Sequence, residues 1–341
     1  MTRSTSVSAT ATSTVTATAS NIPILLLTFL TFLTSVLAST PDRIPSLPQD
    51  DVSLSHTPRA TKPFLLRVMP LGASITVGYQ SSDGTGYRKV LREQLRYAGW
   101  EVDMVGALAN GTMKDNQNEG HFGKTIDEVA NAAVDSAPMQ PNVILINVGT
   151  NDGLQNVHIK GAGDRIDSLM DDLFSRIPNT TIILSTLIPN TQIQRVVERL
   201  STEYRNVVAR RRAAGDRVVL AEMAYFVDSN TLVDGTHPND TGYKRMASVW
   251  WAAIQTAEEE GFLRRPNEVS RAMVSVLRGN GTREGQGLDD GPVQDPELPF
   301  YIAPAQPAID GNTGGAAELG IGKGVWVLLG VQVVALATLM G

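Results

Sequence analysis

Residues 143–152 read Val-Ile-Leu-Ile-Asn-Val-Gly-Thr-Asn-Asp, an almost unbroken apolar run that ends in a polar turn. A strand with water on one face alternates apolar and polar side chains, whereas this run is apolar at nearly every position. It therefore predicts a strand that is buried on both faces, as the strands of a parallel sheet are. Helices must then cover both faces of that sheet.

Strands and helices are predicted to alternate on either side of this run. Short apolar runs predict strands at residues 65–71, 102–106, 143–148, 181–187 and 217–223. Apolar residues every three or four positions predict helices at residues 87–98, 126–134, 166–177, 193–214 and 241–260. This order predicts a three-layer α/β/α sandwich around a five-stranded, flavodoxin-like parallel sheet. Ligands bind such folds beyond the carboxyl ends of the strands.

The predicted domain covers residues 63–263, because its flanks lack periodic apolar patterns. Residues 1–38 predict a secretory signal peptide, whose apolar run from Ile22 ends in small residues at Ala38. An uncleaved membrane anchor is the alternative interpretation of this segment. Residues 39–62 are rich in Pro, Ser and Asp and predict a linker.

The C-terminal region has two predicted parts. Residues 264–324 are rich in Gly and Pro and predict a stalk, and residues 325–341 form an apolar tail. Small residues, a short spacer and an apolar end are the order of a GPI-attachment signal, with a membrane-spanning helix as the alternative. Either interpretation predicts a protein that is secreted or held at the cell surface, with the tail or a lipid contacting the membrane.

Composition excludes several classes of function. The formal net charge is −6, and Arg210–Arg212 is the one cluster of basic residues, so a nucleic-acid partner is not expected. The chain has no cysteine, which removes disulfides, thiolate catalysis and cysteine zinc sites. We expect a monomer that needs no metal and no cofactor.

Four Asn-x-Ser/Thr sequons occur, at Asn110, Asn179, Asn239 and Asn280. Such triplets arise often by chance, so they support secretion only weakly. A glycan on Asn239 would crowd His237, two residues away, and we expect that asparagine to be unmodified.

Two further polar loops carry the residue types of nucleophilic catalysis: Gly72-Ala-Ser-Ile-Thr76 and Asp234-Gly-Thr-His-Pro-Asn239. A serine hydroxyl needs an adjacent base. Of the four histidines, His237 alone follows a carboxylate by three residues within a turn. Asp234 can then hold the imidazole so that its Nε2 accepts the Ser74 proton. Taken singly, each motif is also an ordinary turn, with Asp240 or Thr241 capping the last helix.

An oxyanion would need hydrogen-bond donors that are already in place. The Asn151 side chain and the backbone N–H groups of Gly106 and Ser74 are the candidates. Two residues near these loops are candidates for substrate binding. His121 contacts either substrate or its own loop, and Asp152 either holds its loop or acts as a second carboxylate.

The joint order of these blocks resembles that of the SGNH (GDSL-type) hydrolases. The blocks are Met69–Thr76, Gly106, Gly149–Asp152 and Asp234–Tyr243. The resemblance implies the SGNH hydrolase fold and assigns the four superfamily roles to Ser74, Gly106, Asn151 and His237, with Asp234 completing a triad.

Within that superfamily, Glu119–Asp127 and the long last block are similar to carbohydrate esterase family three, which implies acetylxylan esterase activity. Two positions depart from the pattern. Ala73 replaces the usual Asp before the nucleophile, and Lys124 stands where a Trp is common.

The sequence therefore predicts an extracellular serine esterase that removes small acyl groups, above all acetyl, from a polysaccharide such as acetylated xylan. One alternative keeps the chemistry and changes the substrate to a lipid ester or a thioester. The other is a cell-surface module that binds glycans without catalysis, which Ala73 would favour.

Overall fold

The computed structural model describes residues 61–270, 272–273, 296, 298–299 and 306–307. The predicted signal peptide, the apolar tail, and most of the linker and stalk lie outside the described residues. No helix in the described part of the chain is both long and apolar enough to cross a membrane.

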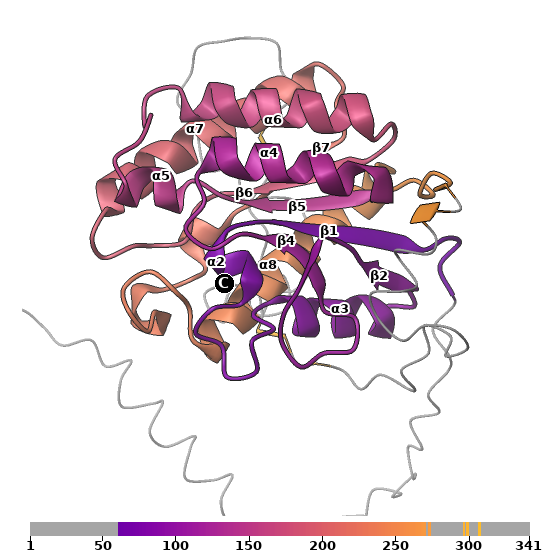
Figure 1. The fold of residues 1–341 in the computed structure, drawn as a ribbon, viewed down its shortest axis with the longest axis horizontal. Coiled ribbons are helices and arrows are strands. Elements are labelled where there is room, and N and C mark those ends of the chain that lie inside the picture. Colours follow the sequence, from indigo (N-terminus) through magenta and orange to yellow (C-terminus); the bar gives the residue numbers. More distant parts are fainter. Residues whose placement is uncertain (1–60, 271, 274–295, 297, 300–305, 308–341) are drawn as a thin grey trace, which may run out of the picture. The chain divides into compact units, whose positions relative to one another are not determined.

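A sheet with helices on both faces forms the centre of the fold (Figure 1). The parallel strands lie in the order β2 (Val102–Met104), β1 (Leu66–Gly72), β5 (Val143–Asn147), β6 (Thr181–Ser185) and β7 (Val218–Ala221). This is the strand order of flavodoxin-like folds. The predicted α/β/α sandwich is confirmed.

Consecutive residues of the central strands enter two separate apolar cores. In β5, Val143 and Leu145 pack into one core, and Ile144 and Ile146 into the other. The first core lies against α3 (Arg88–Tyr97) and α8 (Asp240–Glu259). The second core lies against the helices α4 (Ile126–Ser136), α6 (Ala162–Arg176) and α7 (Gln194–Ala213). This double burial is why the strand is apolar at successive positions.

The sheet has seven strands rather than the five predicted. The additional strands β3 (Leu108–Ala109) and β4 (Gln117–Gly120) form an antiparallel pair, and β4 also pairs with the end of β1. The sequence of β4 is Gln-Asn-Glu-Gly, which is buried although it has no apolar residue. Apolar periodicity therefore cannot detect this strand.

Two short helices begin where the central strands end. Helix α2 (Ser74–Val77) follows β1, and α5 (Thr150–Leu154) follows β5. The chain leaves β1 toward β2 on one side and leaves β5 toward β6 on the other, so the two connections diverge here. Such a switch point is where these folds bind their ligands.

Described residues after position 263 contact the predicted domain. The Asn142 side chain donates to the Arg264 carbonyl oxygen at 2.6 Å, and Leu298 packs against the α3/α8 core. The Gln306 amide accepts from Leu220 N at 2.8 Å and donates to Leu220 O at 3.0 Å, so it pairs with the outer edge of β7. The described parts of the predicted stalk thus contact the domain.

Candidate active site

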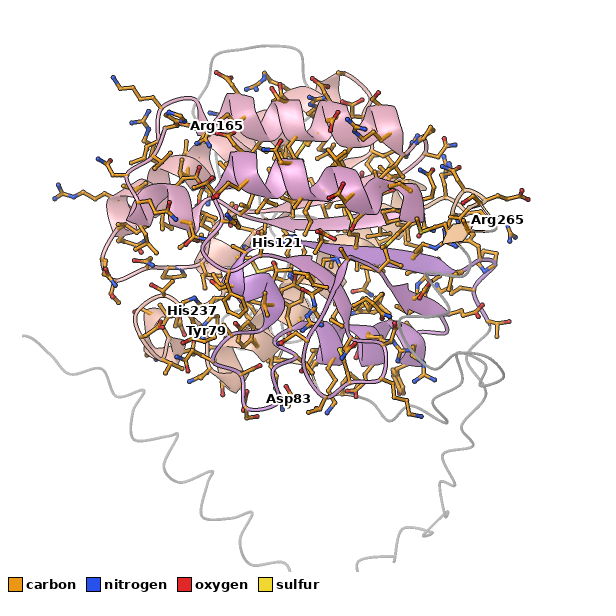
Figure 2. The ribbon with its side chains drawn as sticks, in the orientation of Figure 1. Tyr79, Asp83, His121, Arg165, His237 and Arg265 are labelled. Carbon is orange, nitrogen blue, oxygen red and sulfur yellow. The ribbon has the colours of Figure 1, made fainter. Side chains whose placement is uncertain are left out.

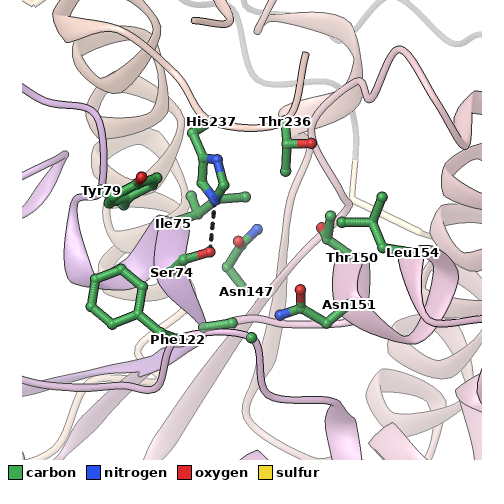
Figure 3. Close-up of a pocket in the computed structure, with 12 residues that line it drawn as sticks. Ser74, Ile75, Tyr79, Phe122, Asn147, Thr150, Asn151, Leu154, Thr236 and His237 are labelled. Atoms are coloured by element: carbon green, nitrogen blue, oxygen red, sulfur yellow. Dashed lines mark hydrogen bonds between the residues drawn. The ribbon is translucent and has the colours of Figure 1, made fainter. Parts of the chain in front are cut away.

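A pocket of about 210 Å³ opens at the carboxyl ends of β1 and β5 (Figure 3). Ser74, Asn151 and His237 line it, although they come from α2, α5 and the turn before the last helix. Figure 2 shows His237 and Tyr79 together at this edge, while Arg265 lies at the opposite end of the sheet. The predicted convergence of the loops is therefore present in the fold.

Ser74 is the first residue of α2, and contacts at both ends of this short helix fix its position. A Cβ atom added at Gly72 would lie 2.2 Å from the Asn147 carbonyl oxygen, so only glycine allows β1 to approach β5 here. At the other end of α2, the buried Arg88 guanidinium donates to the carbonyl oxygens of Thr76 at 3.1 Å and Val77 at 2.8 Å. Burial lowers the pKa of Arg88 to about 10, which leaves it charged at neutral pH.

His237 lies in a tight turn before α8. Val233 N donates to His237 O at 2.8 Å, and Leu232 forms a bridge with Pro238. Asn239 caps α8, because its side-chain oxygen accepts from Gly242 N at 3.0 Å. The cap is therefore Asn239, not Asp240 or Thr241 as the sequence suggested.

Ser74, His237 and Asp234 form a continuous hydrogen-bonded chain. Ser74 Oγ lies 2.9 Å from His237 Nε2, and His237 Nδ1 lies 2.7 Å from Asp234 Oδ2. The other Asp234 oxygen accepts the backbone N–H groups of Thr236 at 3.0 Å and His237 at 2.8 Å. The carboxylate thus fixes both the turn and the imidazole orientation that places Nε2 at the serine.

The electrostatics of Asp234 suit this role. Burial would raise its pKa, but the hydrogen bonds from the His237 ring and from the two backbone N–H groups hold the pKa of Asp234 below its ordinary value. The carboxyl group is therefore ionised at neutral pH. An ionised carboxylate can stabilise the imidazolium that forms when His237 takes a proton.

Asn151 lies across the pocket from His237 (Figure 3). One of its amide hydrogens is donated to the Lys124 carbonyl oxygen at 2.9 Å, which leaves the second donor of the NH₂ group. The Ser74 N–H belongs to the first turn of α2, whose N–H groups have no partner within the helix. The geometry therefore permits both as oxyanion donors.

Gly106 is not among the residues that line the pocket. Its φ of 153° and a virtual Cβ only 2.1 Å from the Asn118 carbonyl carbon show that close packing against β4 requires glycine here. Its role as an oxyanion donor stays a prediction.

A sequence model of the family described as GDSL-like Lipase/Acylhydrolase matches residues 68–250, which is more than half of the chain. The chain belongs to this family. The resemblance to SGNH (GDSL-type) hydrolases is thereby confirmed, and the chain belongs to a family of enzymes, as predicted.

Two relatives of this GDSL hydrolase are known as esterases. A multidomain esterase of Ruminococcus flavefaciens is 27% identical over 239 residues, which are 58% of this chain and 29% of the relative. A family 3 carbohydrate esterase of Clostridium thermocellum has 26% identity and a TM-score of 0.53, with 57% of this chain and 98% of that chain covered. The chain thus spans less than a third of the curated relative.

Asp152 follows Asn151 in the GDSL hydrolase but has a different environment. It is completely buried, and its carboxylate accepts from Ile126 N at 3.0 Å and from Arg165 Nη1 at 2.7 Å. Burial raises the pKa of Asp152, although Arg165 opposes the shift. The carboxylate links α5 to α4 and α6, so the substrate-binding interpretation does not fit the structure and the loop-holding interpretation does.

His121 likewise contacts a buried carboxylate and does not line the pocket. Its Nε2 lies 2.6 Å from the buried Glu119 carboxylate, and its backbone N–H donates to Gly72 O at 2.9 Å. The next two residues, Phe122 and Gly123, line the pocket, whereas His121 does not. The structure therefore fits the loop-packing interpretation of His121 and not direct substrate contact.

Tyr79 and Phe122 are site residues that the sequence reasoning missed. Both line the pocket, and their side chains remain 45% and 58% exposed. The Tyr79 ring lies 4.8 Å from the His237 ring and 5.6 Å from the Phe122 ring, nearly perpendicular to both. The available signal was a lone Phe in Gly120-His-Phe-Gly123, and a single aromatic residue in a loop does not show which way it points.

Proposed function

We propose that this protein is a secreted or cell-surface serine esterase that removes acetyl groups from a polysaccharide such as acetylated xylan. The observation that carries the proposal is the chain of hydrogen bonds from Ser74 Oγ through His237 to Asp234, at the wall of an open pocket. The likeness to a family 3 carbohydrate esterase supports the choice of substrate.

In the first step, Ser74 Oγ attacks the ester carbonyl carbon, and its proton passes to His237 Nε2. The carbonyl oxygen becomes an oxyanion, which the backbone N–H groups of Ser74 and Gly106 and the second Asn151 amide hydrogen stabilise. When the bond between carbon and the sugar oxygen breaks, His237 returns the proton to that oxygen. The products are the free sugar hydroxyl and an acetyl-serine.

In the second step, water attacks the acetyl-serine. His237 takes a proton from the water, whose oxygen bonds to the acyl carbon. The bond to Ser74 Oγ then breaks, and His237 returns the proton to Ser74 as acetic acid leaves and ionises. The cycle balances without a metal or a cofactor.

The pocket beside Ser74 has a volume of about 210 Å³, which has room for a short acyl group such as acetyl. Because the pocket is open to solvent, its volume sets no limit on acyl length, and a series of esters of increasing acyl length separates acetyl esters from long-chain lipid esters. The preformed contact between Ser74 and His237 favours catalysis over a non-catalytic binding module.

Replacement of Ser74 by Ala tests the proposed chemistry. We expect Ser74→Ala to lower kcat for acetate release from acetylated xylan by ~10⁴-fold or more, because the acyl-enzyme cannot form. Ser168→Ala, at an exposed serine of α6, is the matched control and should retain activity. A folded Ser74→Ala enzyme with undiminished turnover would refute the mechanism.

The proposed location has its own support and its own test. It rests on the sequence of residues 1–38 and 325–341. Expression of the full chain should place activity in the medium or on the cell surface, and a phosphatidylinositol-specific phospholipase should release a GPI-anchored form. Activity confined to the cytosol would contradict the proposal.

A further inference from the structure

An aromatic wall borders the proposed catalytic serine. It consists of Tyr79 and Phe122, whose rings meet edge to face with 5.6 Å between centroids and 87° between planes (Figure 3). Burial of a Phe side chain stabilises a fold, and Phe122 forgoes much of that stabilisation because it is 58% exposed. Two such rings side by side at a pocket are typical of a binding surface.

Phe122 lies at the tip of a tight turn. Lys124 N donates to His121 O at 3.3 Å, which closes a four-residue turn over residues 121–124. Gly123 takes a φ of 71° at the third position, where such a turn requires glycine. The turn therefore directs the Phe122 side chain outward.

Hydrogen bonds from three sides hold this turn. At its start, His121 N donates to Gly72 O at 2.9 Å, and the His121 ring lies 2.6 Å from the Glu119 carboxylate. At its end, Gln155 donates to Gly123 O at 2.7 Å, and Asn151 donates to Lys124 O at 2.9 Å. The ring of Phe122 is thus presented on a fixed backbone, which lowers the entropy lost on binding a ligand.

The position of this wall indicates which part of an ester it contacts. His237 Nε2 must reach the leaving oxygen, so the alcohol portion of the substrate lies next to His237. Tyr79 packs against the His237 ring at 4.8 Å, with Phe122 beside it, whereas Asn151 lies on the other side of Ser74 (Figure 3). The alcohol portion therefore meets the aromatic wall, and the carbonyl oxygen points away from it.

We infer that Tyr79 and Phe122 bind the sugar ring that carries the acetyl group, through the apolar C–H face of that ring. This inference rests on the proposed function and adds the residues that select the alcohol. It also assigns a role to His121 and Glu119, which position Phe122 without contacting substrate.

Two measurements on the full chain test the aromatic wall. The first is the ratio of kcat/KM for acetylated xylobiose to kcat/KM for ethyl acetate, which Phe122→Ala should lower about tenfold, mainly through KM. Phe122→Trp should restore the ratio. Tyr225→Ala, at an aromatic residue that is 72% exposed outside the pocket, should leave it unchanged.

The second measurement does not depend on catalysis. Titration calorimetry should show xylotetraose binding to Ser74→Ala about tenfold more tightly than to Ser74→Ala/Phe122→Ala. If the wild type hydrolyses no ester, the proposed function fails, and this comparison alone decides the inference.

Three results would overturn the inference. One is an unchanged substrate ratio in Phe122→Ala, and another is xylotetraose that does not bind or binds both variants equally. The third is a loss of kcat/KM in Phe122→Ala that is larger for ethyl hexanoate than for ethyl acetate, which would assign the aromatic wall to the acyl chain.

Discussion

At the residue scale, Asp234 joins two tasks in one carboxylate. One oxygen accepts from the His237 ring, and the other closes the turn through the backbone N–H groups of Thr236 and His237. In Asp234→Asn the side-chain amide would favour the wrong imidazole tautomer. We expect kcat for acetate release to fall roughly 10⁴-fold at neutral pH, while the circular dichroism spectrum stays that of the wild type. Retention of most activity would contradict the triad.

The same carboxylate predicts how stability depends on pH. The pKa of Asp234 is lower in the folded state than in the unfolded chain, so the ionised form stabilises the fold. This contribution is complete above the ordinary pKa of an aspartate, ~3.9, and is lost as the pH falls through the lower folded value. The free energy of unfolding, measured with urea, should therefore be higher for wild type than for Asp234→Asn at pH 6, and this difference should be smaller at pH 3. A difference that widens on acidification would contradict the sign of the shift.

At the scale of elements, the close approach of β1 and β5 sets the distance between α2 and α5. A methyl group on Gly72 would meet the Asn147 carbonyl oxygen, which belongs to rigid backbone. We expect Gly72→Ala to destabilise the fold by about 1–3 kcal/mol or more and to lower kcat, because Ser74 would move relative to Asn151. Denaturant unfolding and acetate release measure the two effects.

The matched control is Gly163→Ala within α6. A methyl group there would lie 3.3 Å from Glu203 Cβ, a contact that a shift of a few tenths of an ångström relieves, and no backbone atom lies as close as at Gly72. Stability should fall less than in Gly72→Ala, with kcat unchanged. Equal losses of stability and kcat in Gly72→Ala and Gly163→Ala would contradict a specific role for the contact between β1 and β5 at Gly72.

At the scale of the whole molecule, residues far along the chain complete the edge of the sheet. The Gln306 side chain supplies both a donor and an acceptor to Leu220 on β7, the outermost strand on that side. Gln306→Ala should lower the free energy of unfolding by about 1–2 kcal/mol through the two lost hydrogen bonds, with kcat unchanged. A chain ending at residue 295 should lose at least as much. Unaltered stability in both would show that this contact does not contribute.

Apolar spacing alone determined the central strands and the long helices, because a parallel strand covered on both faces must be apolar at successive positions. The serine, histidine and aspartate were likewise predictable, since each stands beside a predicted strand end or turn. Only the tertiary structure decided the roles of neighbouring polar residues. Asn151 faces the pocket while Asp152 binds Arg165, and Phe122 faces it while His121 binds Glu119. The physical reason is that the hydrogen-bond partners of a buried polar group are distant in sequence, so local sequence patterns do not identify them.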